Sequence, residues 1–311
     1  LLPTRPEPHY LRGRMLRAVM QDGAALVEQE EALRKDPSFA PARYERLVLV
    51  FRCFQARADA LISAARRTEA AIAPVELVRA DAQARSLLDR LREDLAALSK
   101  EAHGVAPAQI ECARGLCAVA EGEAEPARKL LTGAIALSSD IEEAYEALAG
   151  LETQQGRFDE SLRWWDEGLK HDQGYAPHRV GRGSACLELA FAESRRRKDP
   201  EPMLKRAIED LERAMAAAPH LPDAVLKLGT ARLESGIALM ARGENPESSY
   251  KSAIALFDAA MAFDAKDADP WHRRGRAKAN WSAWKAHVGE DSEPLLREAI
   301  DDLAKAVATR D

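Results

Sequence analysis

The sequence lacks most of the features that mark a secreted, metal-binding or membrane-spanning protein. Its 311 residues include only four cysteines. None of them forms a C-x-x-C pair or a metal-binding spacing with histidine, which argues against zinc sites and disulfides and favours a reducing compartment. No apolar run approaches the about 20 residues that span a bilayer, and no signal-peptide pattern opens the chain. We therefore expect a cytoplasmic protein.

Catalytic motifs are also missing. The seven histidines are scattered, and the sequence contains no H-E-x-x-H, G-x-S-x-G, P-loop or G-x-G-x-x-G motif. An active site needs several converging groups with defined roles. We therefore expect no enzymatic activity, no metal site and no cofactor.

The sequence has no excess of positive charge. Asp and Glu outnumber Lys and Arg by 51 to 45, for a net charge of −6, and the acidic excess lies in 106–175. Because a basic surface is typical of nucleic-acid binding, we expect neither nucleic-acid nor membrane contact. A nucleic-acid-reading helical repeat is kept as a competing hypothesis.

The sequence does contain a repeat. Two sets of small residues recur every 46 positions: Gly183, Gly229 and Gly275, and Ala207, Ala253 and Ala299. Each of these alanines opens a near-copy of the same segment, namely AIEDLERAM, AIALFDAAM and AIDDLAKAV. A fixed period of this length indicates stacked supersecondary units.

Near the N-terminus the same landmarks are closer together. Gly13, Ala25, Ala32 and Pro37 are separated by 12, seven and five residues. These intervals resemble the tetratricopeptide repeat, a pair of antiparallel helices with the pattern W-x-x-L-G-x-x-Y, A-x-x-x-F and P. The resemblance implies an all-α fold, a right-handed superhelical solenoid of helix hairpins.

The resemblance divides the chain into segments. The prolines near the start predict a linker, and the first residue, Leu1, suggests a piece of a longer protein. The predicted segments are a linker at 1–9, ordinary repeats at 10–39, 108–141 and 142–175, an elongated irregular hairpin at 40–107, and elongated repeats at 176–221, 222–267 and 268–311. In 40–107 we expect one long helix over 42–72, ended by Pro74, and a second over 77–98.

The three C-terminal repeats are elongated at one place. Gly183 lies 24 residues before Ala207, twice the ordinary interval, and the two later repeats match it. We expect the 12 extra residues to lengthen both helices by one to two turns. The hairpin tips would then form a ridge that carries Arg195 to Lys198 and Trp284.

In the tetratricopeptide family, partners bind the concave surface that the first helix of each repeat lines. Residues three, four and seven apart share a helix face. On this basis the predicted partner-binding residues are His272, Arg276 and Asn280, then Leu226, Thr230 and Leu233, then Ser184, with Trp284 on the ridge. The rest of the predicted lining is Asp269, Asp223, Val180, Leu187, Glu143, Glu146, Gly150, Gln109, Cys112 and Leu116.

Each of these features has a plainer interpretation. Arg276, Asn280 and His272 either bind an anionic group or form a solvated polar helix face. The acidic cluster around Glu143 either attracts a basic segment or favours the start of its helix through the helix dipole. Trp284 and Trp281 either pack in the core or provide an exposed hot spot.

The function that the resemblance implies is a protein–protein interaction scaffold. We expect it to be the repeat region of a larger protein, such as a bacterial signalling protein linked to a kinase. The alternative is a helical-repeat domain that senses a small molecule. The last helix would leave Ile300 and Val307 partly uncovered, which predicts either a continuation of the chain or a homotypic contact through this end.

Overall fold

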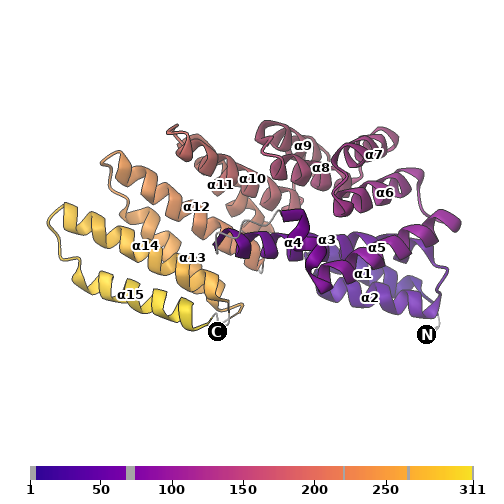
Figure 1. Cartoon of the computed structure of the whole chain (residues 1–311), viewed down its shortest axis with the longest axis horizontal. Coiled ribbons are helices and arrows are strands. Elements are labelled where there is room, and N and C mark those ends of the chain that lie inside the picture. The colour runs from indigo at the N-terminus through magenta and orange to yellow at the C-terminus, as the bar shows by residue number, and fades with distance from the viewer. Residues whose placement is uncertain (1–4, 68–73, 220, 265–266, 310–311) are drawn as a thin grey trace. The chain divides into compact units, whose positions relative to one another are not determined.

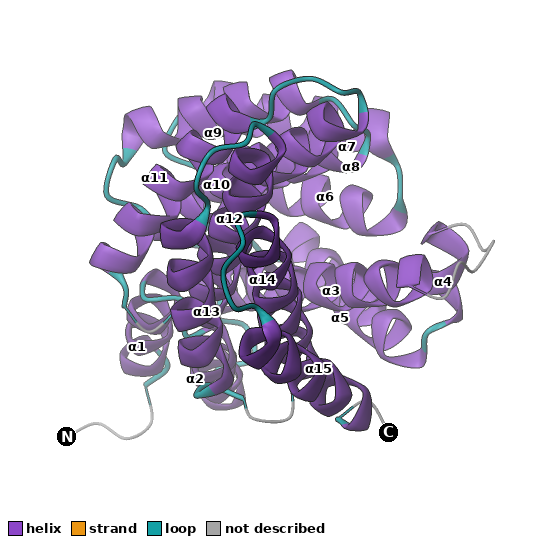
Figure 2. Cartoon of the chain, turned by 90° about the vertical axis from the view of Figure 1, so that its left-hand side faces the viewer, coloured by secondary structure: helices purple, strands orange, loops and turns teal. Residues whose placement is uncertain are grey.

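The computed structural model describes residues 5–67, 74–219, 221–264 and 267–309 (Figure 1). Over these ranges every regular element is an α-helix and no strand occurs (Figure 2). The all-α prediction is therefore confirmed. The helices form two compact units, 1–154 and 155–311.

The first unit contains α1 to α8. Their bounds are α1 Glu7–Ala18, α2 Asp22–Lys35, α3 Ala40–Arg67, α4 Pro74–Ala80, α5 Ala82–Lys100, α6 Pro107–Glu121, α7 Ala124–Leu137 and α8 Glu142–Gln154. Helix α1 begins at Glu7, so it takes in the last three residues of the segment that was predicted as a linker. Pro8 lies in its first turn, where a proline costs no helix hydrogen bond.

The second unit contains α9 to α15. Their bounds are α9 Phe158–His171, α10 Ala176–Arg195, α11 Glu201–Ala217, α12 Pro222–Ala241, α13 Glu247–Met261, α14 Ala268–His287 and α15 Glu293–Ala308. Three hairpins follow one another here, α10 with α11, α12 with α13 and α14 with α15, and consecutive hairpins pack side by side (Figure 1).

The repeated glycines lie where the two helices of a hairpin come closest. A Cβ on Gly183 would lie 2.8 Å from Leu211 Cγ, and one on Gly229 would lie 2.7 Å from Phe257 Cε1. Both distances are shorter than a non-bonded contact between carbon atoms allows. The 46-residue period therefore records close helix packing within each hairpin.

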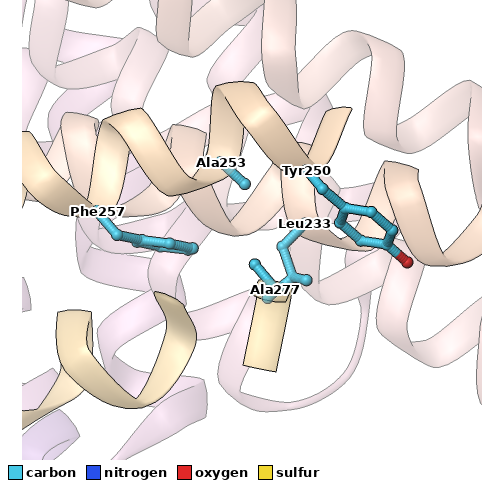
Figure 3. Packing of buried hydrophobic residues seen from close by; sticks show 5 residues of the cluster. All are labelled: Leu233, Tyr250, Ala253, Phe257 and Ala277. Atoms are coloured by element: carbon cyan, nitrogen blue, oxygen red, sulfur yellow. The ribbon is translucent and has the colours of Figure 1, made fainter. Parts of the chain in front are cut away.

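Large apolar side chains fill the space around these contacts. Leu233, Tyr250, Ala253, Phe257 and Ala277 form one fully buried cluster, which joins α12, α13 and α14 (Figure 3). Ala277 comes from the next hairpin, so the cluster packs consecutive repeats together as well as the two helices of one repeat.

The elongation falls mostly on one helix of each pair. Helices α10, α12 and α14 have 20 residues each, whereas α6 has 15. The second helices α11, α13 and α15 have 17, 15 and 16 residues, close to the 14 of α7. The prediction that both helices gain one to two turns is therefore wrong for the second helix. Of the 12 added residues, six lengthen the first helix and three extend the second helix ahead of its repeat alanine, which is less than one turn. The other three lengthen the tip loops 196–200, 242–246 and 288–292.

The three tip loops share one backbone conformation. Arg197, Gly243 and Gly289 are 46 residues apart and have φ angles of 58°, 73° and 80°. The next residue in each loop donates a backbone hydrogen bond back into the first helix, for example from Lys198 N to Glu193 O at 2.9 Å. This is the left-handed helix ending that favours glycine, and Arg197 adopts it with a full side chain.

The segment 40–107 differs from the expected pair of long helices. Helix α3 covers 40–67, and the rest of the helix predicted to 72 lies outside the described residues. The second helix is split into α4 and α5 at Asp81, whose side chain accepts a hydrogen bond from Ala84 N at 2.8 Å and caps α5. Asp81 also accepts a hydrogen bond from Arg57 Nε on α3 at 3.0 Å, which fixes the break against the neighbouring helix.

A buried ion pair recurs between the helices of several hairpins. An arginine Nε donates to an aspartate Oδ2 in Arg46–Asp94 at 2.9 Å, Arg182–Asp210 at 2.7 Å and Arg274–Asp302 at 2.8 Å. The hairpin of α3 and α5 therefore has the same helix register as that of α10 and α11. In the hairpin of α12 and α13 the matching positions are Leu228 and Leu256.

Candidate functional site

The predicted partner-binding residues of the second unit lie on α10, α12 and α14. Val180, Leu226 and His272 are 46 residues apart, and so are Ser184, Thr230 and Arg276. The repeat therefore places them in equivalent positions on successive first helices. Their exposure nevertheless differs strongly.

Arg276 is the best-positioned cation on this face. Its Nη2 lies 3.0 Å from Glu234 Oε1 on α12. The Glu234 side chain is 14% exposed and the Arg276 side chain is 44% exposed. Burial raises the pKa of Glu234, and the charge of Arg276 opposes this shift. A carboxylate on the neighbouring helix thus fixes one edge of the guanidinium, while much of the guanidinium remains open to solvent.

Asn280 lies one turn after Arg276 on α14 and is half-buried. Its amide forms no hydrogen bond with any residue that the structure describes. Arg276 and Asn280 therefore present donors and an acceptor that are not used up by the fold.

A second arginine ties α14 to α12. Arg273 Nη1 donates to Thr230 Oγ1 at 3.0 Å, and Thr230 Oγ1 donates to Leu226 O at 2.9 Å. Thr230 is 5% exposed. Its hydroxyl is thus occupied by this chain of hydrogen bonds and helps to hold the two helices together.

The other predicted residues have mixed positions. Leu233 is fully buried in the cluster of Figure 3, so its side chain is not available to a partner. His272 is exposed, and Leu226 is half-buried. Ser184 is half-buried, and its Oγ has no hydrogen bond among the described residues.

The tryptophans of α14 have different surroundings. Trp281 packs against the buried cluster, with Lys251 Nζ 5.6 Å from its ring centre. This position matches core packing. Trp284 is half-buried, and its ring centre lies 5.8 Å from that of His287.

The acidic residues predicted in the first unit serve the fold. Arg17 on α1 donates a hydrogen bond to Glu143 on α8. Burial alone would raise the pKa of Glu143, but the charge and hydrogen bond of Arg17, together with a backbone hydrogen bond and the charge of Arg52, outweigh burial and lower the pKa. Glu146 accepts hydrogen bonds from Arg52 at 2.9 and 3.0 Å. Both carboxylates are therefore partners of arginines within their own unit.

The other first-unit positions of the predicted lining are also occupied by internal contacts. Cys112 and Leu116 are buried in the core. Gln109 Oε1 accepts a hydrogen bond from Ala106 N at 2.9 Å at the start of α6. These three side chains offer little to a partner.

A cavity that the sequence pattern does not predict lies between two hairpin tips of the second unit. Its volume is about 550 Å³, and it lies between the tip of α10 and α11 and the end of α12. Its apolar lining includes Phe191, Leu204, Ile237 and Ala238, and Arg197 and Lys198 lie at its charged side. Aligning the repeats by their 46-residue period could have indicated this cavity, because several residues that line it differ from those 46 positions later.

Among the described residues, no group of three or more His, Cys, Asp or Glu side chains is arranged to hold a metal ion. No helix in the described ranges is long and apolar enough to cross a bilayer.

Comparison with solved structures addresses the fold. The C-terminal part of a TPR repeat-containing protein from Cytophaga hutchinsonii matches 96% of this chain and 98% of its own, at 10% identity and a TM-score of 0.52. The fold is that of a tetratricopeptide repeat protein. The likeness predicted from the spacing of small residues is thus confirmed at the level of the fold.

Other tetratricopeptide structures match a smaller part of the chain. MamA from Desulfovibrio magneticus matches 65% of this chain and 94% of its own, at 15% identity and a TM-score of 0.48. YrrB, described as a TPR protein with an unusual peptide-binding site, matches 71% of this chain and 91% of its own, at 19% identity and a TM-score of 0.32. No protein-family model matches the sequence, and no curated protein does.

Proposed function

We propose that this chain is a protein–protein interaction scaffold and that its second unit binds a partner protein or peptide on the first helices α12 and α14. The observation that carries the proposal is the pairing of Arg276 with Glu234. It holds in one place the guanidinium of a side chain that is 44% exposed, one turn from an amide that no described residue hydrogen-bonds. Binding groups that are fixed in advance lose less entropy when a partner arrives.

The chemistry of this pair favours a peptide. A guanidinium has five N–H donors in one plane, and the Glu234 contact uses only one edge. The remaining donors suit a carboxylate or a backbone carbonyl, and the Asn280 amide can both donate to and accept from a peptide backbone. His272 and Leu226, on the same face, would extend the contact.

The proposal has a wider part that rests on the tetratricopeptide resemblance. In it, the scaffold is the repeat region of a larger bacterial signalling protein that includes a kinase and acts in the cytoplasm. The four cysteines are unpaired thiols, three of them buried, which suits a reducing compartment. Isolating the full-length protein and identifying its other domains tests this part.

A homotypic contact through the last helix is proposed as well. Leu296, Ile300 and Val307 on α15 are 45%, 57% and 63% exposed. They lie on the side of α15 where a further repeat would pack. Sedimentation of wild type and Ile300→Glu checks this contact: the wild type should self-associate with rising concentration and the variant should not.

One observation favours the sensing alternative. A cavity of about 470 Å³ in the first unit is lined by apolar residues of α3 and α5, among them Phe54, Ala58 and Leu88, with Arg85 and Arg92 beside them. This volume lies within the range of small-molecule sites. A thermal-shift screen against metabolites decides the matter, because a ligand that raises the melting temperature by several degrees would favour a sensor.

A cross-linking pull-down from the source cell tests the scaffold proposal. The bait is the full chain, as wild type, as Arg276→Ala with Asn280→Ala, and as Arg213→Ala. Arg213 is an exposed arginine on α11, away from the proposed face. We expect the double variant to lose partners that wild type and Arg213→Ala both keep. Equal recovery by all three baits would contradict the proposed face.

A further inference from the structure

The tip cavity of the second unit differs from its counterpart in the next repeat. Tyr250 takes the place equivalent to Leu204, and Trp284 takes the place equivalent to Ala238, each 46 positions later. Tyr250 is fully buried, and a Cβ on Gly236 would lie 2.5 Å from its Cε1. The cavity is lined instead by Leu204 and Ala238, which are smaller than Tyr250 and Trp284. At these two places the cavity is therefore lined by smaller side chains than those of the next repeat.

The charge at this place also differs between the repeats. Arg197 and Lys198 line the cavity, whereas the equivalent residues are Gly243 and Glu244. Arg197 and Lys198 form no ion pair or side-chain hydrogen bond with any residue that the structure describes, and neither do Arg195 and Arg196 just before them. Two cations that line the cavity, and the two that precede them in the chain, thus lack a counter-charge among the described residues.

The carboxylates of the cavity are already paired. Asp199 lies 3.5 Å from Arg242 Nη1, and Glu234 lies 3.0 Å from Arg276 Nη2. The uncompensated charge around the cavity is therefore positive. An acidic group on a partner would find cations there that no described residue of this chain pairs with.

The backbone of Arg197 gives a third, independent indication. Its φ of 58° is the left-handed conformation that Gly243 and Gly289 adopt at the equivalent positions. A residue with a Cβ is less stable in this conformation than glycine. Non-glycine residues held in such conformations are enriched at binding sites. The strained residue here is also one of the cations that line the cavity.

We infer that the tip cavity binds an acidic segment of a partner protein, with one aromatic side chain inserted between Leu204 and Ala238. The inserted ring occupies the volume that Tyr250 and Trp284 fill in the next repeat. Arg197 and Lys198 contact carboxylates that flank the ring. This inference rests on the proposed scaffold function and assigns a second surface, which adjoins the first because Glu234 lines the cavity and pairs with Arg276.

Fluorescence anisotropy on the full chain tests the inference. The probe is a labelled peptide, blocked at both ends, in which a central Trp is flanked by Asp on both sides. Two control peptides carry Ala in place of the Trp or Asn in place of the Asp residues. We expect the probe to bind at least about tenfold more tightly than either control, and its affinity to fall as salt is added.

Three variants use residues that the chain itself carries one repeat later. Ala238→Trp and Leu204→Tyr each fill the cavity, and Arg197→Gly with Lys198→Glu removes its cations. We expect each to weaken the probe at least about tenfold. The last variant lies on an exposed loop, so it keeps the test valid if a filled cavity perturbs the fold.

Arg213→Ala, which removes an exposed arginine paired with Glu209 on α11, should leave the probe affinity unchanged. Equal binding of probe and controls by the wild type, or wild-type affinity in the filled and charge-removed variants, would overturn the inference. The pull-down with the Arg276 and Asn280 variant reports separately on the scaffold proposal.

Discussion

Arg182 on α10 holds the carboxylate of Asp210 on α11 with two hydrogen bonds, from Nε to Oδ2 at 2.7 Å and from Nη2 to Oδ1 at 2.6 Å. Asp210 is 1% exposed. The next hairpin replaces both residues together, by Leu228 and Leu256. The chain thus contains both the ion pair and its apolar substitute in the same helix register.

The first prediction uses this internal substitution. Asp210→Leu alone leaves Arg182 without its buried partner and should lower the free energy of unfolding by about 3 kcal/mol. Arg182→Leu with Asp210→Leu copies the next hairpin and should recover most of that loss. Urea denaturation measures all three proteins. A double variant no more stable than Asp210→Leu would show that the pair has a role beyond helix packing.

The second prediction concerns the strained tip residue. Arg197→Gly should raise the free energy of unfolding by about 1 kcal/mol, because glycine adopts the left-handed conformation without the Cβ clash. Gly243→Arg should lower it by a similar amount. Thermal denaturation reports both changes. A destabilised Arg197→Gly protein would mean that the Arg197 side chain stabilises the tip.

The third prediction contrasts two helical glycines. A Cβ on Gly229 would lie 2.7 Å from Phe257 Cε1, so Gly229→Ala should destabilise the second unit by about 1–3 kcal/mol. Gly133 lies within α7, and the nearest atom to its added Cβ is 3.7 Å away. Gly133→Ala should therefore stabilise the protein by about 0.5–1 kcal/mol through helix propensity. Calorimetry should show a lower free energy of unfolding for Gly229→Ala and a higher one for Gly133→Ala. Changes of the same sign in both variants would contradict this account.

The fourth prediction concerns acid stability of the split between α4 and α5. The hydrogen bond from Arg57, together with that from Ala84 N, lowers the pKa of Asp81 from 3.8 to about 2. A carboxylate whose pKa is lower in the folded than in the unfolded state stabilises the fold at pH values above its unfolded-state pKa. This contribution is lost as the pH falls from 3.8 towards about 2. The stability difference between wild type and Asp81→Asn should shrink over that interval in acid titrations followed by circular dichroism. A constant difference would contradict the role of the charge.

Much of the fold could be predicted because small residues are required wherever two helices touch. Gly183 and Ala207 therefore recur in each repeat, and the intervals between such residues can be recognised in the sequence. The hairpin of α3 and α5 was harder, because its ion pair places Leu47 and Leu91 at the positions equivalent to Gly183 and Ala207. Its helix register is shared with the other hairpins, but its landmarks are not. The repeat boundaries themselves remain a prediction.

The candidate site was less predictable from the sequence. Helix periodicity indicates which residues share a face, but it does not show how deeply each one lies. The pattern places Leu233 and Arg276 on the same binding face, yet Leu233 is fully buried and the Arg276 side chain is 44% exposed. The hydrogen bond from Arg17 to Glu143 joins residues 126 positions apart, and no local sequence pattern predicts such a contact. The tip cavity has Leu204 and Ala238 where the next repeat has Tyr250 and Trp284, a difference that only a comparison of repeats in register makes visible.

The central claim is that the second unit recognises a partner through its first helices and their tips. Hydrogen exchange, measured by mass spectrometry on the full chain with and without a partner recovered in the pull-down, tests it most directly. We predict that the partner slows exchange in α12, in α14 and in the tip segment 194–200. Slower exchange confined to the first unit, with these segments unchanged, would contradict the claim.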